Sequence, residues 1–356
     1  MVYPDKIYEL AFALRDIAPW KKMGDLQAFS FVSRRTGQDI YCIFTGYLGE
    51  YIALDAYVGE EGLQILYQVA EIGTNLPDYA VDDFDPDLVY QAKLQNLVQC
   101  GFFSTKEVPK EQLTAVKNYA KKNGKTLTGR QDIPTFMDFY PMYQETSVKD
   151  GDRLDILEQA MEVALVHQKM YQGKWESLPE ISPTERALIP CFTWNDEAWK
   201  VKARKIPAYD PDFQMEDVLF QDKTLEKRLG QLPKRGTIAL ELIPFLGPTG
   251  FKGDYVYPLM LLAYNVNKDQ VLQPPLAVHE KGMSNREVWT VLLKGFIENI
   301  ILSEGVLPKT ILYAGKPAKF VLRDFCEHLG IQLIKTERIP ELDNFYLNLM
   351  QGGMND

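Results

Sequence analysis

Cysteine and histidine are scarce in this sequence: 356 residues contain four cysteines and three histidines. The cysteines are far apart, with no Cys-x-x-Cys pair, and one histidine, His328, lies near a cysteine in the sequence. This spacing excludes the common zinc-site patterns and gives no support to a disulfide framework. We therefore expect buried, reduced thiols in a cytoplasmic protein, and no cofactor. The thiols are those of Cys42, Cys100, Cys191 and Cys326.

A long apolar run is also missing. Charges at Asp5, Glu9, Arg15 and Asp16 interrupt the N-terminal stretch MVYPDKIYELAFALRDIAPW. The stretch therefore fits neither the apolar core of a signal peptide nor a membrane span. We expect no membrane partner.

Positive charge is in short supply, with a net charge of −10 and an isoelectric point near 5.1. Such a balance opposes nonspecific binding to nucleic acid and to anionic membranes. We expect a protein partner rather than nucleic acid. The acidity is uneven, because residues 221–356 are nearly neutral and the preceding residues carry the excess. Both this asymmetry and the chain length favour two domains.

Catalytic signatures are absent as well. The sequence has no Gly-x-Ser-x-Gly elbow and no His-Glu-x-x-His pair. The stretch GPTGFKG at 247–253 lacks the P-loop spacing and joins two expected strands, so we interpret it as a hairpin loop. His167, His279 and His328 are isolated and are expected to pack or to cap helices. No catalytic residue is assigned.

Five aspartates crowd residues 78–87, DYAVDDFDPD. An EF-hand loop would need a glycine and a closing glutamate at set positions, and neither is present. We interpret the segment as a solvated acidic loop.

The stretch YCIFTGYLGEYIALDAYVGEEGL, residues 41–63, mixes acids, glycines and aromatic residues. Two β-rich runs are joined through Gly46 and Gly49, which allow positive φ in the connection. A helical pattern with acids in its first turn follows. We interpret the stretch as a hairpin and helix that form scaffold rather than an active site.

Other segments of the first half have clear periodicities. Helical spacing of apolar residues predicts helices over 4–18 and 151–171. A shorter helix is expected at 109–123, which begins with a proline, and a strand at 88–103. Residues 173–235 are rich in proline and tryptophan and are interpreted as a connector with some strand.

From residue 236 the pattern is regular: three strands, then helix, strand, helix, strand, helix. The fold class is therefore α+β. We expect an N-terminal α+β domain at 1–205, a connector at 206–235 and an α/β domain at 236–356.

Two resemblances accompany these patterns. The motifs APW at 18–20, YC at 41–42 and GYLGEYIALDAYVGEEGL at 46–63 resemble an uncharacterised bacterial two-domain family, which implies no activity. The order of elements from 236 to 350 is similar to that of the ribonuclease H-like fold. That resemblance implies a two-metal site, in which carboxylates hold ions about 4 Å apart.

The acids required by such a site are incomplete. The first strand offers Glu241, the first helix Glu287 or Glu298, and the last helix Asp343, whereas the fourth strand ends in Tyr-Ala-Gly. Glu241, Glu287 and Asp343 are thus the alternative metal-binding candidates, for a metal-dependent phosphodiesterase or nuclease. Because one ligand is missing, we expect instead a non-enzymatic binding or interaction protein. An aromatic cluster provides candidates for a binding patch: Phe136, Phe139, Tyr140 and Tyr143.

Overall fold

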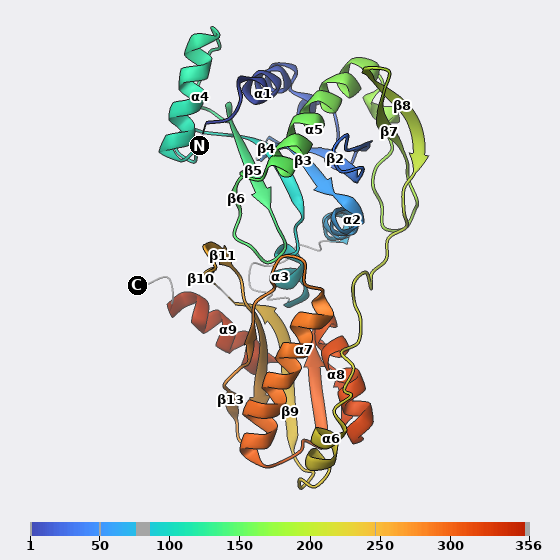
Figure 1. The fold of residues 1–356 in the computed structure, drawn as a ribbon, viewed down its shortest axis with the longest axis vertical. Helices are drawn as coiled ribbons and strands as arrows, with labels where there is room; N and C mark the ends of the chain where they lie inside the picture. Colours follow the sequence, from blue (N-terminus) through green and yellow to red (C-terminus); the bar gives the residue numbers. More distant parts are fainter. Residues whose placement is uncertain (1, 50, 76–85, 246, 353–356) are drawn as a thin grey trace. The chain divides into compact units, whose positions relative to one another are not determined.

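The computed structural model describes residues 2–49, 51–75, 86–245 and 247–352, which divide into two compact units (Figure 1). Unit 1 comprises Met1–Pro77, Gln95–Tyr140 and Glu145–Pro211. Unit 2 comprises Asp78–Leu94, Pro141–Gln144 and Asp212–Asp356. Both units combine helices with mixed sheets, so the predicted α+β class is confirmed. Most of the predicted acidic loop at 78–87 lies outside the described residues.

The described part of unit 1 is built on an eight-stranded sheet in the order β6-β5-β4-β3-β2-β1-β7-β8. Neighbouring strands are antiparallel, except that β1 and β7 are parallel. The strands are β1 (Ala28–Val32), β2 (Asp39–Thr45), β3 (Ile52–Val58), β4 (Leu97–Phe103), β5 (Ile133–Phe139), β6 (Thr146–Ser147), β7 (Leu188–Asn195) and β8 (Ala198–Lys205).

Helices cover both faces of this sheet. The predicted long helices are α1 (Asp5–Ile17) and α5 (Gly151–Met170), and their apolar faces share one core with β2, β3 and β4. The predicted short helix is α4 (Lys110–Lys122), with Pro109 at its N-cap. On the opposite face lies α2 (Gly59–Asn75), where Gly62 approaches β3 so closely that a Cβ would lie 2.8 Å from the Tyr57 carbonyl carbon.

The stretch 41–63 forms the predicted hairpin and helix. Strands β2 and β3 pair antiparallel and lead directly into α2. Gly46 and Gly49 adopt φ of 113° and 85°, a region in which L-residues are strained. Asp55 lies on β3, and its carboxylate accepts hydrogen bonds from Thr45 Oγ1 of β2 at 2.9 Å and from Gln99 Nε2 of β4 at 2.6 Å. The buried carboxylate therefore has a structural use.

One prediction of secondary structure was wrong. Residues 88–92, expected to begin a strand over 88–103, belong to the helix α3 (Pro86–Ala92), and the strand is limited to β4. The strand expected within residues 173–235 is the β7–β8 hairpin, which extends the sheet of unit 1. Strand β8 lies at the edge of this sheet: Trp199 and Val201 pack against the core of unit 1, and exposed lysines alternate with them.

Unit 2 contains, among its described residues, a mixed sheet in the order β13-β12-β9-β15-β16, with β14 also paired to β12. Strands β15 and β16 run parallel to β9, and β12 runs antiparallel to it. The predicted loop at 247–253 lies in the β10–β11 hairpin. The strands are β9 (Thr237–Pro244), β10 (Thr249–Phe251), β11 (Asp254–Val256), β12 (Leu259–Asn265), β13 (Gln270–Leu272), β14 (Leu276–Ala277), β15 (Thr310–Ala314) and β16 (Gln332–Lys335).

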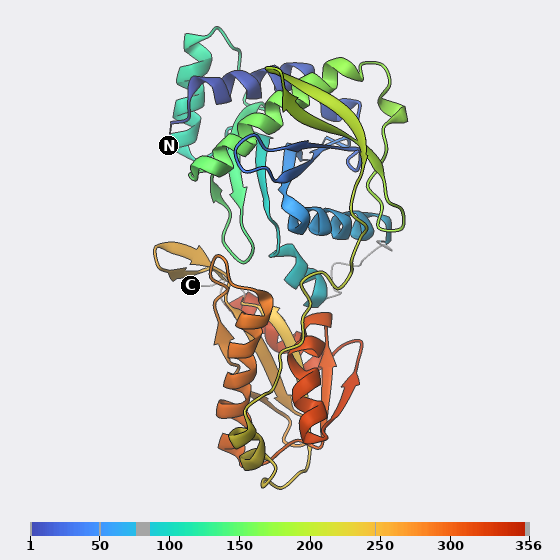
Figure 2. The same ribbon diagram turned by 45° about the vertical axis from the view of Figure 1, so that its right-hand side comes forward.

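The sheet of unit 2 lies between two layers of helices (Figure 2), and alternate residues of β9 pack against them. Leu240 and Leu242 pack with α7 (Asn285–Phe296) and α8 (Lys316–Leu329), whereas Ala239 and Ile243 pack with α9 (Pro340–Gly352). The even and odd positions of β9 therefore mark the two faces. None of the described helices combines the length and the apolar character needed to span a bilayer.

Candidate functional site

The acid predicted on the first strand of unit 2 is buried. Glu241 lies in β9 on the face covered by α9; it has no solvent exposure, and neither carboxylate oxygen has a hydrogen-bond partner. Burial, followed by the nearby charge of Asp343, raises the pKa of Glu241 to about 8. The Ile339 amide offsets part of this shift, although its geometry falls short of a hydrogen bond. Glu241 therefore holds a proton at neutral pH.

Asp343, in the first turn of α9, is the second acid of this cluster and is 2% exposed. Arg338 Nε donates to its Oδ2 at 2.9 Å, while Oδ1 has no hydrogen-bond partner. Burial raises the pKa of Asp343, and the bond from Arg338 opposes that shift. The structure thus brings Glu241 and Asp343 together, with an arginine in place as counter-charge.

A third acid, Asp87 on α3, was not among the predicted residues. Its Oδ1 accepts a 2.7 Å hydrogen bond from the backbone amide of Lys316, the first residue of α8, and its charge contributes to the raised pKa of Glu241. On β15 the residue paired with Glu241 is Ala314, so that strand supplies no acid, as the sequence indicated. The signal for α3 was the Pro86-Asp87 pair, which is typical of a helix start.

Glu287 has a different environment. It forms a capping box at the start of α7, where its Oε2 accepts from the Ser284 amide at 2.7 Å and the Ser284 hydroxyl at 2.9 Å. Helix α7 packs on the face of the sheet opposite to Glu241, so the structure does not bring Glu287 to the other two acids. Across the described parts of the chain, no group of three Asp, Glu, His or Cys side chains is placed to hold a metal ion.

The predicted aromatic patch does not form as one surface. Phe136 is 1% exposed and packs in the core of unit 1, with its ring 4.9 Å from that of Tyr3. Phe139, Tyr140 and Tyr143 are half-buried, and Tyr143 belongs to unit 2, where Lys281 Nζ lies 4.8 Å from its ring centre.

The isolated histidines fit the predicted packing and capping uses. His167 is fully buried in α5, with its ring 4.6 Å from that of Phe29, and burial lowers its pKa to about 3. It is therefore neutral at physiological pH. His328 lies in the last turn of α8, where Nδ1 is 2.9 Å from the Asp324 carbonyl oxygen.

Unit 2 also contains a pocket that the sequence did not indicate. Its volume is about 470 Å³, within the range of small-molecule sites. It lies at the amino end of β9, beside the turn after β12 and the segment that leads into β15. The residues that line it are Arg235, Gly236, Thr237, Ile238, Asn265, Asn267, Lys268, Ile300, Ile301, Glu304, Val306 and Pro308.

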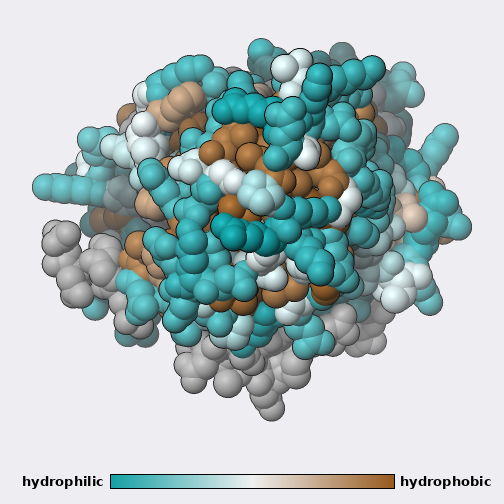
Figure 3. Space-filling view, turned by 90° about the horizontal axis from the view of Figure 1, so that it is seen from below, coloured by the Kyte–Doolittle hydropathy of each residue, from teal (hydrophilic) through white to brown (hydrophobic). Residues whose placement is uncertain are grey.

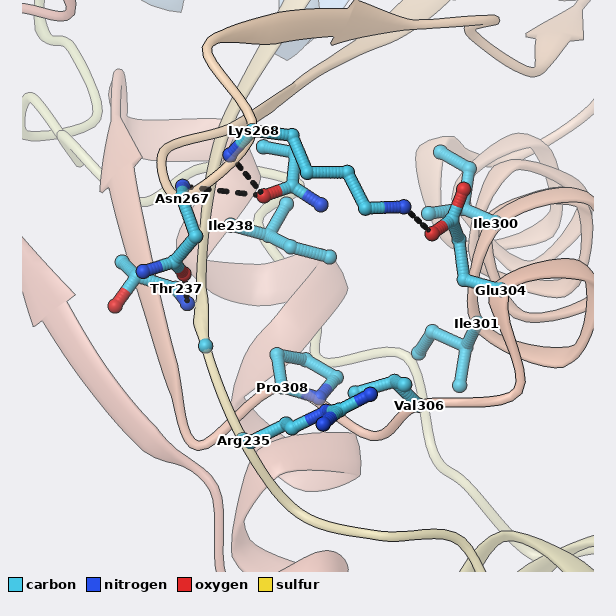
Figure 4. Close-up of a pocket in the computed structure, with 12 residues that line it drawn as sticks. Arg235, Thr237, Ile238, Asn267, Lys268, Ile300, Ile301, Glu304, Val306 and Pro308 are labelled. Atoms are coloured by element: carbon cyan, nitrogen blue, oxygen red, sulfur yellow. Dashed lines mark hydrogen bonds and ion pairs between the residues drawn. The ribbon is translucent and has the colours of Figure 1, made fainter.

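One side of this pocket is apolar. Ile300 and Ile301 lie in a π-helical turn, η3 (Ile297–Leu302), that continues α7, and Val306 and Pro308 follow it along the chain (Figure 4). Ile238 lies between these residues and the β12 turn in the same view. Because π-helical turns are rare and frequently occur at functional sites, η3 is a second feature that marks this place.

The rim of the pocket is polar. Lys268 reaches across to form an ion pair with Glu304, and Arg235 extends beside Pro308 and Val306 (Figure 4). The β12 turn is held by its own side chains, because Asn265 Oδ1 accepts from the Lys268 amide at 3.1 Å and Asn267 Oδ1 from the Thr237 amide at 2.7 Å. The turn therefore holds the rim in one geometry.

Figure 3 shows the surface at the end of unit 2 where α6 (Lys223–Leu229) lies. This surface is mostly hydrophilic, but apolar side chains gather near its centre. Apolar side chains thus reach the surface at this end of unit 2.

Two family models match different parts of the chain. The model of a domain of unknown function, DUF7309, matches residues 5–186. The chain belongs to the DUF7309 family. A second model, also of a domain of unknown function (DUF6930), matches residues 225–350, and no curated protein matches the chain. The predicted resemblance to an uncharacterised two-domain family is confirmed.

The two matches and the two units do not coincide. The DUF7309 match includes α3, which belongs to unit 2, and it stops before β7 and β8, which complete the sheet of unit 1. The pocket and the Glu241–Asp343 pair lie within the DUF6930 match.

Proposed function

We propose that this chain is a non-catalytic binding protein and that its ligand is a small molecule held in the pocket of unit 2. The pocket supports this function because it combines an apolar wall with a few fixed polar groups, as ligand sites do. The ion pair of Lys268 and Glu304 spans two of its sides, so a ligand would be enclosed by groups that are already placed.

A thermal-shift screen of small organic compounds tests this proposal when it is run on the full chain with two tryptophan variants. Val306→Trp fills the pocket, whereas Val291→Trp places the same side chain at a half-exposed position of α7. We expect compounds that raise the melting temperature of wild type and Val291→Trp but not of Val306→Trp. Compounds that stabilise all three proteins equally, or none of them, would count against the pocket.

We further propose that unit 2 has a ribonuclease H-like fold without that fold's chemistry. The strand order β13-β12-β9-β15-β16 and the parallel pairing of β15 and β16 with β9 support the first part. The capping role of Glu287, the closed burial of Glu241 and the alanine opposite it argue against a metal-dependent phosphodiesterase. We also propose a cytoplasmic protein, since all four cysteines are free and buried. A protein partner in addition to the small ligand stays a prediction.

A further inference from the structure

We infer that the pocket of unit 2 selects a small monocarboxylic acid with an apolar body. This inference rests on the pocket being a ligand site, as proposed above, and adds the chemical class of the ligand.

Two hydrogen-bond donors on the pocket lining have no acceptor in the part of the chain that the structure describes. The Arg235 guanidinium is exposed and makes no hydrogen bond or ion pair with the described residues. The carboxamide of Asn265 uses its oxygen to accept from the amides of Asn267 and Lys268, and its NH₂ group donates to no described residue. Both groups can therefore donate to a ligand in place of water. A guanidinium fork matches a planar carboxylate with two parallel hydrogen bonds.

The charge on the lining fits one negative charge. Arg235 and Lys268 are cationic and Glu304 is anionic, so the three leave a single positive charge unmatched. Lys268 is already paired with Glu304, which leaves Arg235 as the cation available to a ligand. A monoanion neutralises the site, whereas a phosphate dianion would bring one charge too many against the Glu304 carboxylate.

The rest of the ligand is defined by the apolar wall. Ile238, Ile300 and Ile301 are buried aliphatic side chains, and no aromatic ring lines the pocket. A ligand that packs against such a wall removes its own aliphatic surface from water, which gains roughly 25 cal/mol per Å². The occupant is therefore an aliphatic acid rather than a sugar or a nucleotide.

Isothermal titration calorimetry on the full chain tests the class with four six-carbon probes: hexanoate, hexanamide, hexylamine and hexyl phosphate. We expect hexanoate to bind about tenfold or more tightly than each of the others, because only it supplies one negative charge to the Arg235 fork. Arg235→Gln should lower the hexanoate affinity by about tenfold or more. Arg286→Gln, an exposed arginine at the opposite end of α7, should bind as wild type does.

The outcomes separate the inference from the proposed function. Equal binding of hexanamide and hexanoate, blocked by Val306→Trp, would overturn the carboxylate and leave the pocket in place. If hexyl phosphate binds more tightly than hexanoate, the pocket does not select a monoanion. If Arg235→Gln binds hexanoate as tightly as wild type does, Arg235 does not bind the carboxylate. If none of the four probes shows binding that Val306→Trp blocks, the inference is wrong. The compound screen would then decide whether the pocket is a ligand site at all. Because Arg235 is exposed, we expect Arg235→Gln to melt at the same temperature as wild type. Equal melting temperatures show that the variant is folded.

Discussion

Lys268 and Glu304 form an ion pair that joins two sides of the pocket in unit 2: Lys268 follows β12, and Glu304 follows the π-helical turn η3 (Figure 4). Their side chains are 52% and 35% exposed, so the pair is solvated and contributes little to stability. Glu304 is the one anion beside two cations, Arg235 and Lys268, on the described lining of the pocket.

Removal of that anion should therefore favour an anionic ligand. We expect Glu304→Gln to tighten hexanoate binding several-fold, since Lys268 is released and one repulsive charge is removed, and to change the free energy of unfolding by less than about 0.5 kcal/mol. Calorimetric titration and urea unfolding measure the two effects. Glu298→Gln, which removes a partner of Lys294 from the same segment, is the control. Weaker binding in Glu304→Gln would contradict the electrostatic reading.

Glu241 should make the stability of the protein depend on pH. Its folded pKa of about 8 lies above the ordinary value of 4.5, so between these values the folded state keeps a proton that the unfolded state has lost. The contribution of Glu241 to the free energy of unfolding is therefore largest below pH 4.5. It falls by up to about 1.4 kcal/mol per pH unit as the pH rises to 8. Glu241→Gln should remove this dependence and be more stable than wild type at pH 8. Urea unfolding from pH 5 to 9 measures both.

Glu287→Gln serves as the control. Hydrogen bonds from the Ser284 amide and hydroxyl lower the pKa of Glu287, so its contribution to stability is lost only as the pH falls below the ordinary value of 4.5. Between pH 5 and 9 we expect Glu287→Gln to keep the wild-type profile. The idea of a buried, protonated Glu241 fails if Glu241→Gln keeps that profile as well.

Divalent cations should not stabilise the acid cluster. Metal binding requires a deprotonated carboxylate, Glu241 is protonated at pH 7, and Arg338 already neutralises Asp343. We expect Mn²⁺ and Mg²⁺ to give equal thermal-shift curves for wild type and Glu241→Gln. A stabilisation of wild type that is lost in the variant would revive the phosphodiesterase alternative.

Arg153 should be among the most sensitive positions of unit 1. Its guanidinium donates to Asp138 Oδ1 at 2.6 Å, to Asn96 Oδ1 at 2.8 Å and to the carbonyl oxygens of Leu97 and Phe139 at 2.9 Å each. We expect Arg153→Ala to cost about 3 kcal/mol, because it leaves a mostly buried carboxylate and two carbonyl groups without their donor. Urea unfolding measures the loss.

Arg35 provides the matched comparison for Arg153. It is 59% exposed and bonds Asp152 at 2.6 Å, so Arg35→Ala should change stability by less than about 1 kcal/mol. Similar losses in both variants would show that burial of the Arg153 network does not matter.

Periodicity in the sequence was sufficient for the regular elements. Helices α1 and α5 and the hairpin before α2 were predicted because their apolar spacing and glycine turns are local properties. Some strand was expected within 173–235, but the proline-rich surroundings gave no bounds for β7 and β8. Helix α3 was missed because its seven residues are too few for helical periodicity to be seen.

The candidate site was less predictable. Glu241 and Asp343 were paired from the order of elements, and the structure places them together. Asp87 and the pocket were missed for a different reason: they depend on which distant segments meet, as when Arg235, Lys268 and Ile300 line one cavity. No local spacing encodes such a meeting.

The most direct measurement is a methyl NMR titration of the full chain, labelled at isoleucine δ1 positions, with hexanoate. Ile238, Ile300 and Ile301 report on the pocket, and the buried Ile7 and Ile133 of unit 1 serve as internal references. We predict saturable shifts at the three pocket methyl groups and none at the references. Unchanged pocket signals, or shifts of equal size in unit 1, would contradict a ligand site in this pocket.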